Sequence, residues 1–261
     1  MQTIKVNTSL GKEEDIVNAV KMLIVSFEMG GGETLHEKRN VIRRIPMSFL
    51  GKKKEMVVKR FKCPNVIQKI GYATGISSPK AVRAYNNATI LRERGFKTPT
   101  EIACLVLKSF GLVNDTYYIC ENTNAHPIIE VFEREKGFHP DAATAFGQFV
   151  AKMHEKGVMH HDLNNTNVLY ERTNKGWRFS LIDINRMTFT PDGSPFTDKK
   201  VCFDNLTRYT GNLELTRHVY LAYLEARGWD TNLIEEAMKV KVEHDSSYAN
   251  RKKWLNKLHL R

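Results

Sequence analysis

Four polar residues in the second half of the chain have the types and spacing needed for phosphoryl transfer. The run His160-His-Asp162-Leu-Asn-Asn-Thr-Asn167 places a carboxylate and an amide on one loop, and a second carboxylate, Asp183, follows sixteen residues later. In a loop of the form H-x-D-x-x-x-x-N, the aspartate accepts the proton of an attacking hydroxyl. The asparagine and the later aspartate bind magnesium ions that neutralise the transferred group. We therefore predict Asp162 as the catalytic base and Asn167 and Asp183 as metal ligands.

The segments on either side of this loop have the pattern of elements that could hold it in place. Residues 141–156 carry apolar side chains at helical spacing and end at Gly157, which predicts a helix that stops before the loop. Residues 168–170 and 177–184 predict two strands joined by a turn at 173–176. Helix, loop, strand, turn, strand and aspartate is the order found in the C-terminal lobe of a kinase-like fold. The alternative is a solvated polar loop that follows a core helix.

Lys59 is the predicted nucleotide ligand in the first half of the chain. It lies at the centre of a strand-like run, residues 55–61, before a predicted helix at 79–94. In kinase-like folds a lysine at this place contacts the α- and β-phosphates of ATP, whereas a strand lysine elsewhere is usually just solvated. We expect further nucleotide contacts from Arg39 and Asn40, in the turn at 37–40. Glu121, at the start of a polar connector, is the first candidate to bind the adenine.

These segments together resemble the lipopolysaccharide-core sugar kinases of Gram-negative bacteria, the Kdo/heptose kinase-like family of the protein-kinase-like superfamily. The resemblance extends from about residue 33 to residue 228 and rests on segments 39–42, 57–62, 78–81, 95–99, 160–167, 181–186 and 206–223. The catalytic loop is shared with other kinase-like families, whereas Arg186 and the helix near the end are more particular to this one. The resemblance implies ATP and Mg²⁺ as cofactors and a membrane glycolipid, Kdo-lipid A or a related inner core, as the acceptor.

Three departures from the family pattern bear on activity. Asn86 stands where the family usually has a glutamate that pairs with Lys59, and Glu93, nearly two turns later, is an alternative partner. Asn185 stands where an aspartate often follows the metal ligand. No G-x-G-x-x-G is present, and the three glycines at 30–32 are equally consistent with a flexible connector. The departures leave open a weakened enzyme or a pseudokinase that acts as a binding module.

The predicted fold is α+β with two lobes. Five runs predict a five-stranded antiparallel N-lobe sheet with one main helix, and residues 13–27 predict an amphipathic packing helix. The five runs are residues 33–36, 41–45, 55–61, 102–107 and 116–121. The nucleotide-binding N-lobe takes residues 1–121. The mainly helical C-lobe takes residues 122–261, with the catalytic loop, the acceptor site and a buried helix at 215–227. Lys52, Lys53 and Lys54 predict a solvated hairpin turn.

Charge and composition narrow the possible partners. The chain has 40 Lys and Arg against 29 Asp and Glu, a net charge of +11, which favours anionic partners. We expect an anionic membrane surface and the phosphates of the substrates, and we expect no nucleic acid. The basic segment at 251–258 either lies on such a membrane or docks on the C-lobe.

Cysteine usage and hydropathy bear on location. Four widely spaced cysteines form no metal or disulfide pattern, and no apolar run is long enough to span a membrane. These features predict a cytoplasmic protein. The family resemblance implies a peripheral location at the cytoplasmic face of the inner membrane, and we expect a monomer. A small atypical protein kinase is a third reading of the chain. The segment from Arg186 to Leu206 lacks an A-P-E motif, which favours a small-molecule or glycolipid acceptor over a protein acceptor.

Overall fold

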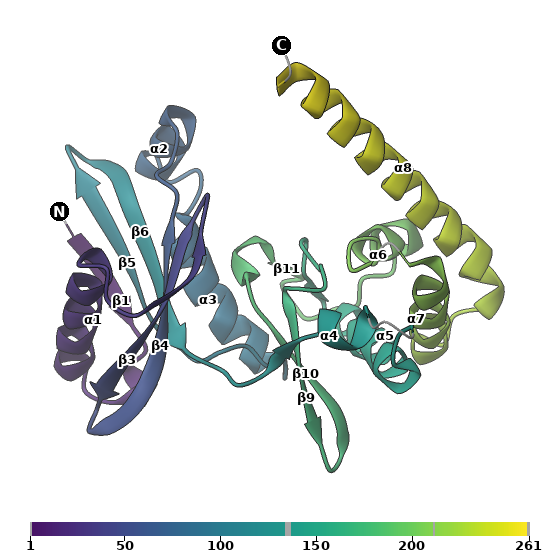
Figure 1. Ribbon diagram of the computed structural model, residues 1–261, viewed down its shortest axis with the longest axis horizontal. Helices are drawn as coiled ribbons and strands as arrows, with labels where there is room; N and C mark the ends of the chain where they lie inside the picture. The colour runs from purple at the N-terminus through teal and green to yellow at the C-terminus, as the bar shows by residue number, and fades with distance from the viewer. Residues whose placement is uncertain (1, 134–136, 211, 260–261) are drawn as a thin grey trace. The chain divides into compact units, whose positions relative to one another are not determined.

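The chain folds into two compact units. The structure, a computed structural model, describes residues 2–133, 137–210 and 212–259 (Figure 1). The first unit consists of Met1–Glu93, Thr98–Asn124 and Asp183–Asn185. The second unit consists of Arg94–Lys97, Ala125–Ile182 and Arg186–Arg261.

A six-stranded antiparallel sheet forms most of the first unit. Its strands are, in spatial order, β1 (Gln2–Val6), β5 (Glu101–Ser109), β6 (Leu112–Glu121), β4 (Lys52–Phe61), β3 (Val41–Phe49) and β2 (Glu33–Glu37). The predicted number of five strands is therefore wrong, because β1 pairs with β5. Ile4 and Val6 of β1 pack on the core. Alternation of apolar and polar residues over only five positions is a weak indication of a strand, and here it rests on these two side chains alone.

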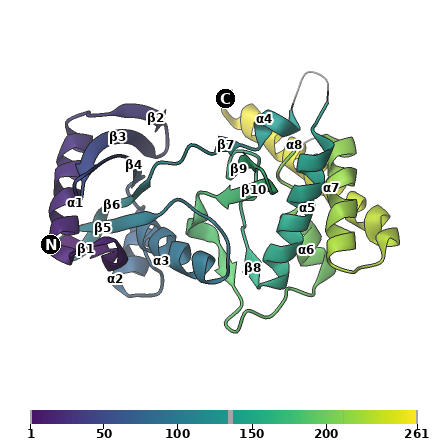
Figure 2. The ribbon, with the colours of Figure 1, turned by 90° about the horizontal axis from the view of Figure 1, so that it is seen from below.

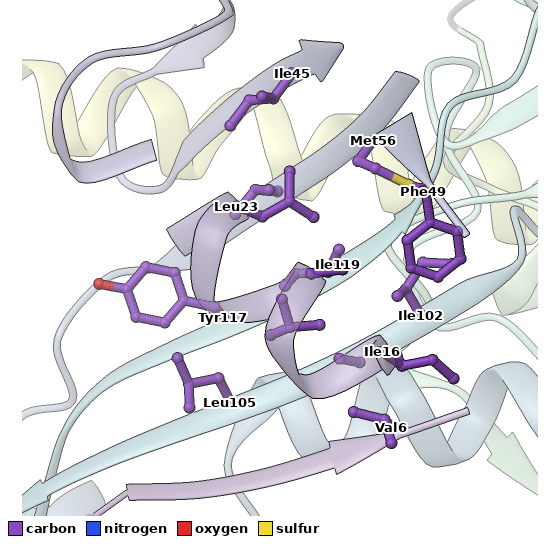
Figure 3. Close-up of a cluster of buried hydrophobic side chains, with 14 of the residues drawn as sticks. Val6, Ile16, Leu23, Ile45, Phe49, Met56, Ile102, Leu105, Tyr117 and Ile119 are labelled. Atoms are coloured by element: carbon purple, nitrogen blue, oxygen red, sulfur yellow. The ribbon is translucent and has the colours of Figure 1, made fainter. Parts of the chain in front are cut away.

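Helices cover both faces of this sheet, with α1 (Glu13–Glu28) on one face and α3 (Lys80–Glu93) on the other (Figures 1 and 2). Both confirm predicted helices, and α1 was predicted from its apolar spacing. The core beneath α1 is shown in Figure 3; it includes Ile16, Leu23, Ile45, Phe49, Met56, Leu105 and Ile119. Strand β5 is buried from Glu101 to Val106, as expected for a strand covered on both sides. A further helix, α2 (Val66–Ala73), was not predicted, and none of its residues is buried.

The β3–β4 hairpin corrects one local prediction. Its two turn residues, Leu50 and Gly51, have φ values of 49° and 77°, the double positive φ that matches the twist of a tight hairpin. Lys52, Lys53 and Lys54 therefore belong to β4, where they pair with β3, and do not form the turn. A run of lysines resembles a turn because it is solvated. The positive φ values that the turn requires are instead adopted by the two residues before the lysines.

The second unit is mainly helical. Its helices are α4 (Ile129–Phe132), α5 (Pro140–Glu155), α6 (Lys199–Asn205), α7 (Leu213–Ala226) and α8 (Ile234–His259). Its strands are β7 (His126–Pro127), β9 (Val168–Thr173) and β10 (Gly176–Leu181) in one sheet and β8 (Val158–Met159) and β11 (Thr188–Phe189) in another. Helices α5 and α7 and the β9–β10 ribbon confirm predicted elements. Across both units, short 3₁₀ helices occupy Thr8–Leu10, Ile184–Arg186 and Thr231–Leu233.

Helix α8 includes the basic segment at 251–258. Near its middle, the buried Lys241 donates to the carbonyl oxygens of Thr207 (2.7 Å) and Thr210 and pairs with Asp245, which docks this part of the helix on its unit. In the basic segment Trp254 is exposed, whereas the side chains at 255–258 lie outside the described residues. Among the helices that the structure describes, none is both long and apolar enough to cross a bilayer.

Candidate active site

The loop between β8 and β9 fixes Asp162 within the second unit. His160 is fully buried; its Nε2 donates to the carbonyl oxygen of Ile182 at 2.9 Å, and its Nδ1 accepts from the N–H of Asp162 at 3.2 Å. This tautomer follows from the partners, since a carbonyl can only accept and an N–H can only donate. Asn167 Nδ2 donates to the carbonyl oxygen of Asp162 at 2.9 Å. The backbone of Asp162 is thus held while its side chain is 30% exposed, as a general base requires.

A chain of hydrogen bonds supports His160 from three helices. Asn205 of α6 donates to the carbonyl oxygen of His160 at 2.8 Å and accepts from Nε2 of His154, on α5, at 3.0 Å. The Nδ1 of His154 accepts from the hydroxyl of Tyr223, on α7, at 2.9 Å. Burial lowers the pKa of His154 to about 4. The imidazole is therefore neutral near pH 7, with the one N–H and one lone pair that these bonds use.

Two side chains beside the base were not predicted as site residues. Arg208 Nη1 lies 3.8 Å from Oδ1 of Asp162 and is half exposed. His161 Nε2 forms a 2.8 Å hydrogen bond with Thr188, and burial together with the charge of Arg208 lowers its pKa. A guanidinium at this place can bind an anionic group of an acceptor next to Asp162. Arg208 follows Asp162 by 46 residues, so no local spacing could indicate it.

In the first unit, Lys59 forms an ion pair with Asp183. The Nζ–Oδ1 distance is 2.6 Å, and the side chains are 12% and 32% exposed. Asn185 Nδ2 donates to the same oxygen at 2.6 Å. Asn87 of α3 donates to the carbonyl oxygen of Ile184 at 2.7 Å, which ties this segment to the helix. The two residues predicted to bind phosphate and metal are therefore in direct contact.

The predicted partners of Lys59 on α3 are not its partner in the structure. Asn86 accepts a 2.8 Å hydrogen bond from Lys5 of β1. Among the described residues, the carboxylate paired with Lys59 is that of Asp183, so Glu93 does not take the role of the family glutamate either. The sequence alone could not show this, because the pair joins residues 124 positions apart.

The backbone at Asp183 adopts an uncommon conformation. Its φ is +54°, and the other described non-glycine residues with positive φ, Leu50 and Phe110, lie in hairpin turns. Asp183 follows β10 by two residues and is not in a hairpin turn. Aspartate tolerates this region better than most residues, and such conformations cluster at functional sites. The backbone geometry thus supports a functional role for this carboxylate.

Comparison with known proteins identifies the family. Residues 43–226, more than two thirds of the chain, match the model of the lipopolysaccharide kinase (Kdo/WaaP) family. The chain belongs to this family. The resemblance predicted from its motifs is therefore confirmed, and the matched region includes Lys59, Asp162, Asn167 and Asp183.

Two individual proteins illustrate the relationship. The 3-deoxy-D-manno-octulosonic acid kinase of Vibrio parahaemolyticus serotype O3:K6 (strain RIMD 2210633) is 29% identical over 114 residues. The match spans 43% of this chain and 46% of that protein, so this chain covers about half the length of the curated relative. A solved structure of WaaP in complex with acyl carrier protein shares 18% identity, with a TM-score of 0.58 over 93% of this chain and 98% of that one. This likeness supports the α+β kinase-like fold.

The remaining residues predicted to bind nucleotide lie in the first unit of this lipopolysaccharide kinase family member. Arg39 is exposed in the β2–β3 turn, and Asn40 Oδ1 accepts from the N–H of Lys62 at 3.1 Å, which anchors the turn to the end of β4. Glu121 ends β6; its N–H donates to Thr100 at 2.9 Å, and its carboxylate pairs with Lys54. These contacts hold Asn40 and Glu121 in the first unit, and the binding of nucleotide by all three residues stays a prediction.

Proposed function

We propose that the chain is an ATP-dependent kinase that phosphorylates a sugar hydroxyl, of Kdo or heptose, in the lipopolysaccharide inner core. The observation that carries this proposal is the β8–β9 loop, which holds the backbone of Asp162 through His160 and Asn167 and keeps its carboxylate accessible. Membership in the lipopolysaccharide kinase (Kdo/WaaP) family indicates the acceptor class. The name of the Vibrio relative favours Kdo among the inner-core sugars.

The proposal gives each site residue a task. Asp162 accepts the proton of the acceptor hydroxyl, a step worth about 10²–10⁴ in rate. Lys59 binds the α- and β-phosphates, while Arg39, Asn40 and Glu121 complete the nucleotide site. Asn167 presents an amide oxygen, since its Nδ2 is used by Asp162, and Asp183 presents a carboxylate. Such oxygen donors suit Mg²⁺, which would neutralise charge on the transferred phosphoryl group.

A second candidate function is a non-catalytic module that binds nucleotide or glycolipid. It is favoured by the uncharged Asn86, which bonds to Lys5 and not to Lys59, and by Asn185 in place of the frequent family aspartate. It is opposed by the presence of Lys59, Asp162, Asn167 and Asp183 together. Turnover decides between the two.

The test is ADP formation by the purified protein with Mg²⁺ and ATP. The acceptors are Kdo-containing lipid A, the same glycolipid extended by heptose, and lipid A without either sugar. We expect ADP formation only with a sugar-bearing acceptor, and its loss in Asp162→Asn with the ATP-induced thermal shift retained. Nucleotide binding without transfer to any acceptor would establish the binding module. Transfer to lipid A itself would contradict the assigned acceptor.

The location and assembly of the protein belong to the same proposal. We expect a monomeric enzyme that meets its glycolipid acceptor at the cytoplasmic face of the inner membrane, with its positive charge toward anionic lipid. The net charge of +11 supports this orientation, because anionic headgroups attract basic surfaces.

A further inference from the structure

A cluster of exposed apolar side chains lies at one edge of the first unit. We call it the α2 patch; it consists of Val66, Ile67 and Ile70 on α2, Ile76 in the α2–α3 connector, and Phe110 in the β5–β6 turn. Exposed fractions range from 54% at Ile70 to 83% at Ile76, and Phe110 is fully exposed. Single exposed apolar residues are normal on protein surfaces, whereas a group of this size usually marks an interaction site.

Hydrogen bonds bring the three segments of the α2 patch together. Lys69 of α2 donates to Oδ1 of Asn114 at 3.3 Å, which places the helix beside the third residue of β6. The turn that carries Phe110 immediately precedes β6. The N–H of Ser77 donates to the carbonyl oxygen of Gly71 at 3.1 Å and folds the connector with Ile76 back on the helix. Figure 1 shows α2 next to β6.

The local structure presents these side chains outward and does not bury them. Asn65 and Gln68 form a capping box, which stabilises the start of α2 without burial of any of its residues. Val66, Ile67 and Ile70 share one face of the helix. Phe110 has a φ of +52°, an uncommon conformation for a bulky residue, and stands at the tip of a hairpin. The patch therefore consists of projecting elements: a helix start, a connector and a hairpin tip.

The charged side chains in the segment around α2 are of one sign. In the β5–β6 hairpin the acidic residue near the tip is Asp115, next to Asn114. No aspartate or glutamate occurs between Glu55 and Glu93, and this interval contains Lys62, Lys69 and Lys80. Lys108 lies two residues before Phe110. A projecting apolar surface bordered by lysines has the composition of an element that binds the interface of an anionic bilayer.

We propose that the α2 patch docks the protein on an anionic lipid membrane, with its apolar side chains among the acyl chains and its lysines against lipid phosphates. Projecting isoleucine and phenylalanine side chains can enter a fluid bilayer without a matching pocket, whereas a protein partner would need one. This docking rests on the proposed function, since it would give the enzyme access to a glycolipid acceptor. The docking itself is measured without catalysis, so the two proposals can fail separately.

The experiment measures binding of the full chain to vesicles by co-sedimentation. The vesicles contain phosphatidylcholine alone or phosphatidylcholine with phosphatidylglycerol. The test variant is the triple change Ile67→Gln, Ile76→Gln and Phe110→Asn; asparagine tolerates the positive φ at 110. The matched control is Met22→Gln with Met29→Gln. It removes side chains of 61% and 82% exposure from α1 and from the residue directly after it, in the same unit.

We expect binding to anionic vesicles that weakens when salt rises from about 0.1 M to about 1 M, because the Debye length falls from about 10 Å to about 3 Å. The triple variant should bind at least about 100-fold more weakly, since burial of each apolar side chain contributes on the order of tenfold or more. Lys62→Gln should weaken binding about fivefold, and the methionine variant should bind as the wild type does.

Three outcomes would overturn the docking proposal. The first is a triple variant that keeps its thermal midpoint and binds vesicles as tightly as the wild type does. The second is a methionine variant whose vesicle binding falls as far as that of the triple variant. The third is a wild type that binds neutral and anionic vesicles equally. An acidic soluble partner is tested with acyl carrier protein in the same assay format. Loss of its binding in the triple variant, with vesicle binding kept, would assign the α2 patch to a protein. Absence of phosphoryl transfer with vesicle binding intact would refute the proposed function alone.

Discussion

The contribution of the ion pair between Lys59 and Asp183 to folding can be measured independently of catalysis. Asp183→Asn removes the charge, keeps the size and keeps a residue that tolerates the φ of +54°. Asp183→Ala would add a backbone cost of about 1–2 kcal/mol for the left-handed conformation, which would obscure the electrostatic effect. Lys59→Met removes the opposite charge and retains an unbranched apolar stem. The double variant completes a thermodynamic cycle.

The exposure of the two side chains sets the expected loss in the free energy of unfolding. At 12% exposure for Lys59 and 32% for Asp183, the pair lies between surface and buried pairs. Surface pairs contribute about 0–1 kcal/mol, and breaking a buried pair costs about 3–5 kcal/mol. We expect each single change to lower the free energy of unfolding by about 1–3 kcal/mol. The double variant should lose less than the sum, with a coupling of about 1–2 kcal/mol.

Urea unfolding followed by circular dichroism measures this cycle. The matched control is the more exposed pair of Lys54 and Glu121, also in the six-stranded sheet, with side chains 33% and 26% exposed, for which we expect a coupling below about 1 kcal/mol. Asp183→Asn should also abolish the magnesium-dependent thermal shift with ATP, and Lys54→Met should keep it. A Lys59–Asp183 coupling below about 0.5 kcal/mol would refute the reasoning that this contact stabilises the first unit.

Four further predictions follow from the contacts around the site. Asp162→Asn should lower phosphoryl transfer by about 10²–10⁴ without loss of ATP binding, and wild-type turnover would exclude it as the base. Arg208→Ala should raise KM for the acceptor about tenfold and leave KM for ATP unchanged, as expected for a side chain that binds an anionic group; an equal rise for ATP would contradict this. Asn86→Glu should pair with Lys5, increase stability by at most about 1 kcal/mol and leave kcat unchanged, whereas a higher kcat would show that it reaches the catalytic lysine. The pKa of His154 falls from 6.5 to about 4 on folding, so the unfolded chain binds more protons in this window. The free energy of unfolding should therefore decrease as pH falls from 6.5 to 4, by up to about 3 kcal/mol, and His154→Gln should flatten that pH profile.

The elements of the fold that the sequence predicts are those whose apolar pattern matches their burial. Helix α1 buries Ile16, Val20, Leu23 and Phe27 at helical spacing, and this same pattern is visible in the sequence. Helix α2 has the opposite relation, because its apolar side chains face outward. Strand β1 owes its place to pairing with β5, about a hundred residues later in the chain, and its own five residues carry little signal.

The same distinction applies to the candidate site. Asp162 and Asn167 could be assigned from the sequence because one local loop sets their spacing. The partner of Lys59 could not be assigned, because the family pattern pointed to Asn86, whereas the observed carboxylate follows a distant strand. Arg208 was missed for a similar reason, since its contact with Asp162 depends on how α6 and the residues after it pack.

The division of the chain has a consequence for the order in which the protein can fold during synthesis. The segment Asp183–Asn185 belongs to the first unit, although Ala125–Ile182 of the second unit is translated before it. The six strands can pair once Glu121 has emerged from the ribosome, but Lys59 acquires its carboxylate only after Asp183 is made. Completion of the N-terminal unit therefore waits until Ala125–Ile182 of the C-terminal unit has been translated. A fragment that ends at Asn124 would contain the whole sheet and still lack the counter-ion of its central lysine.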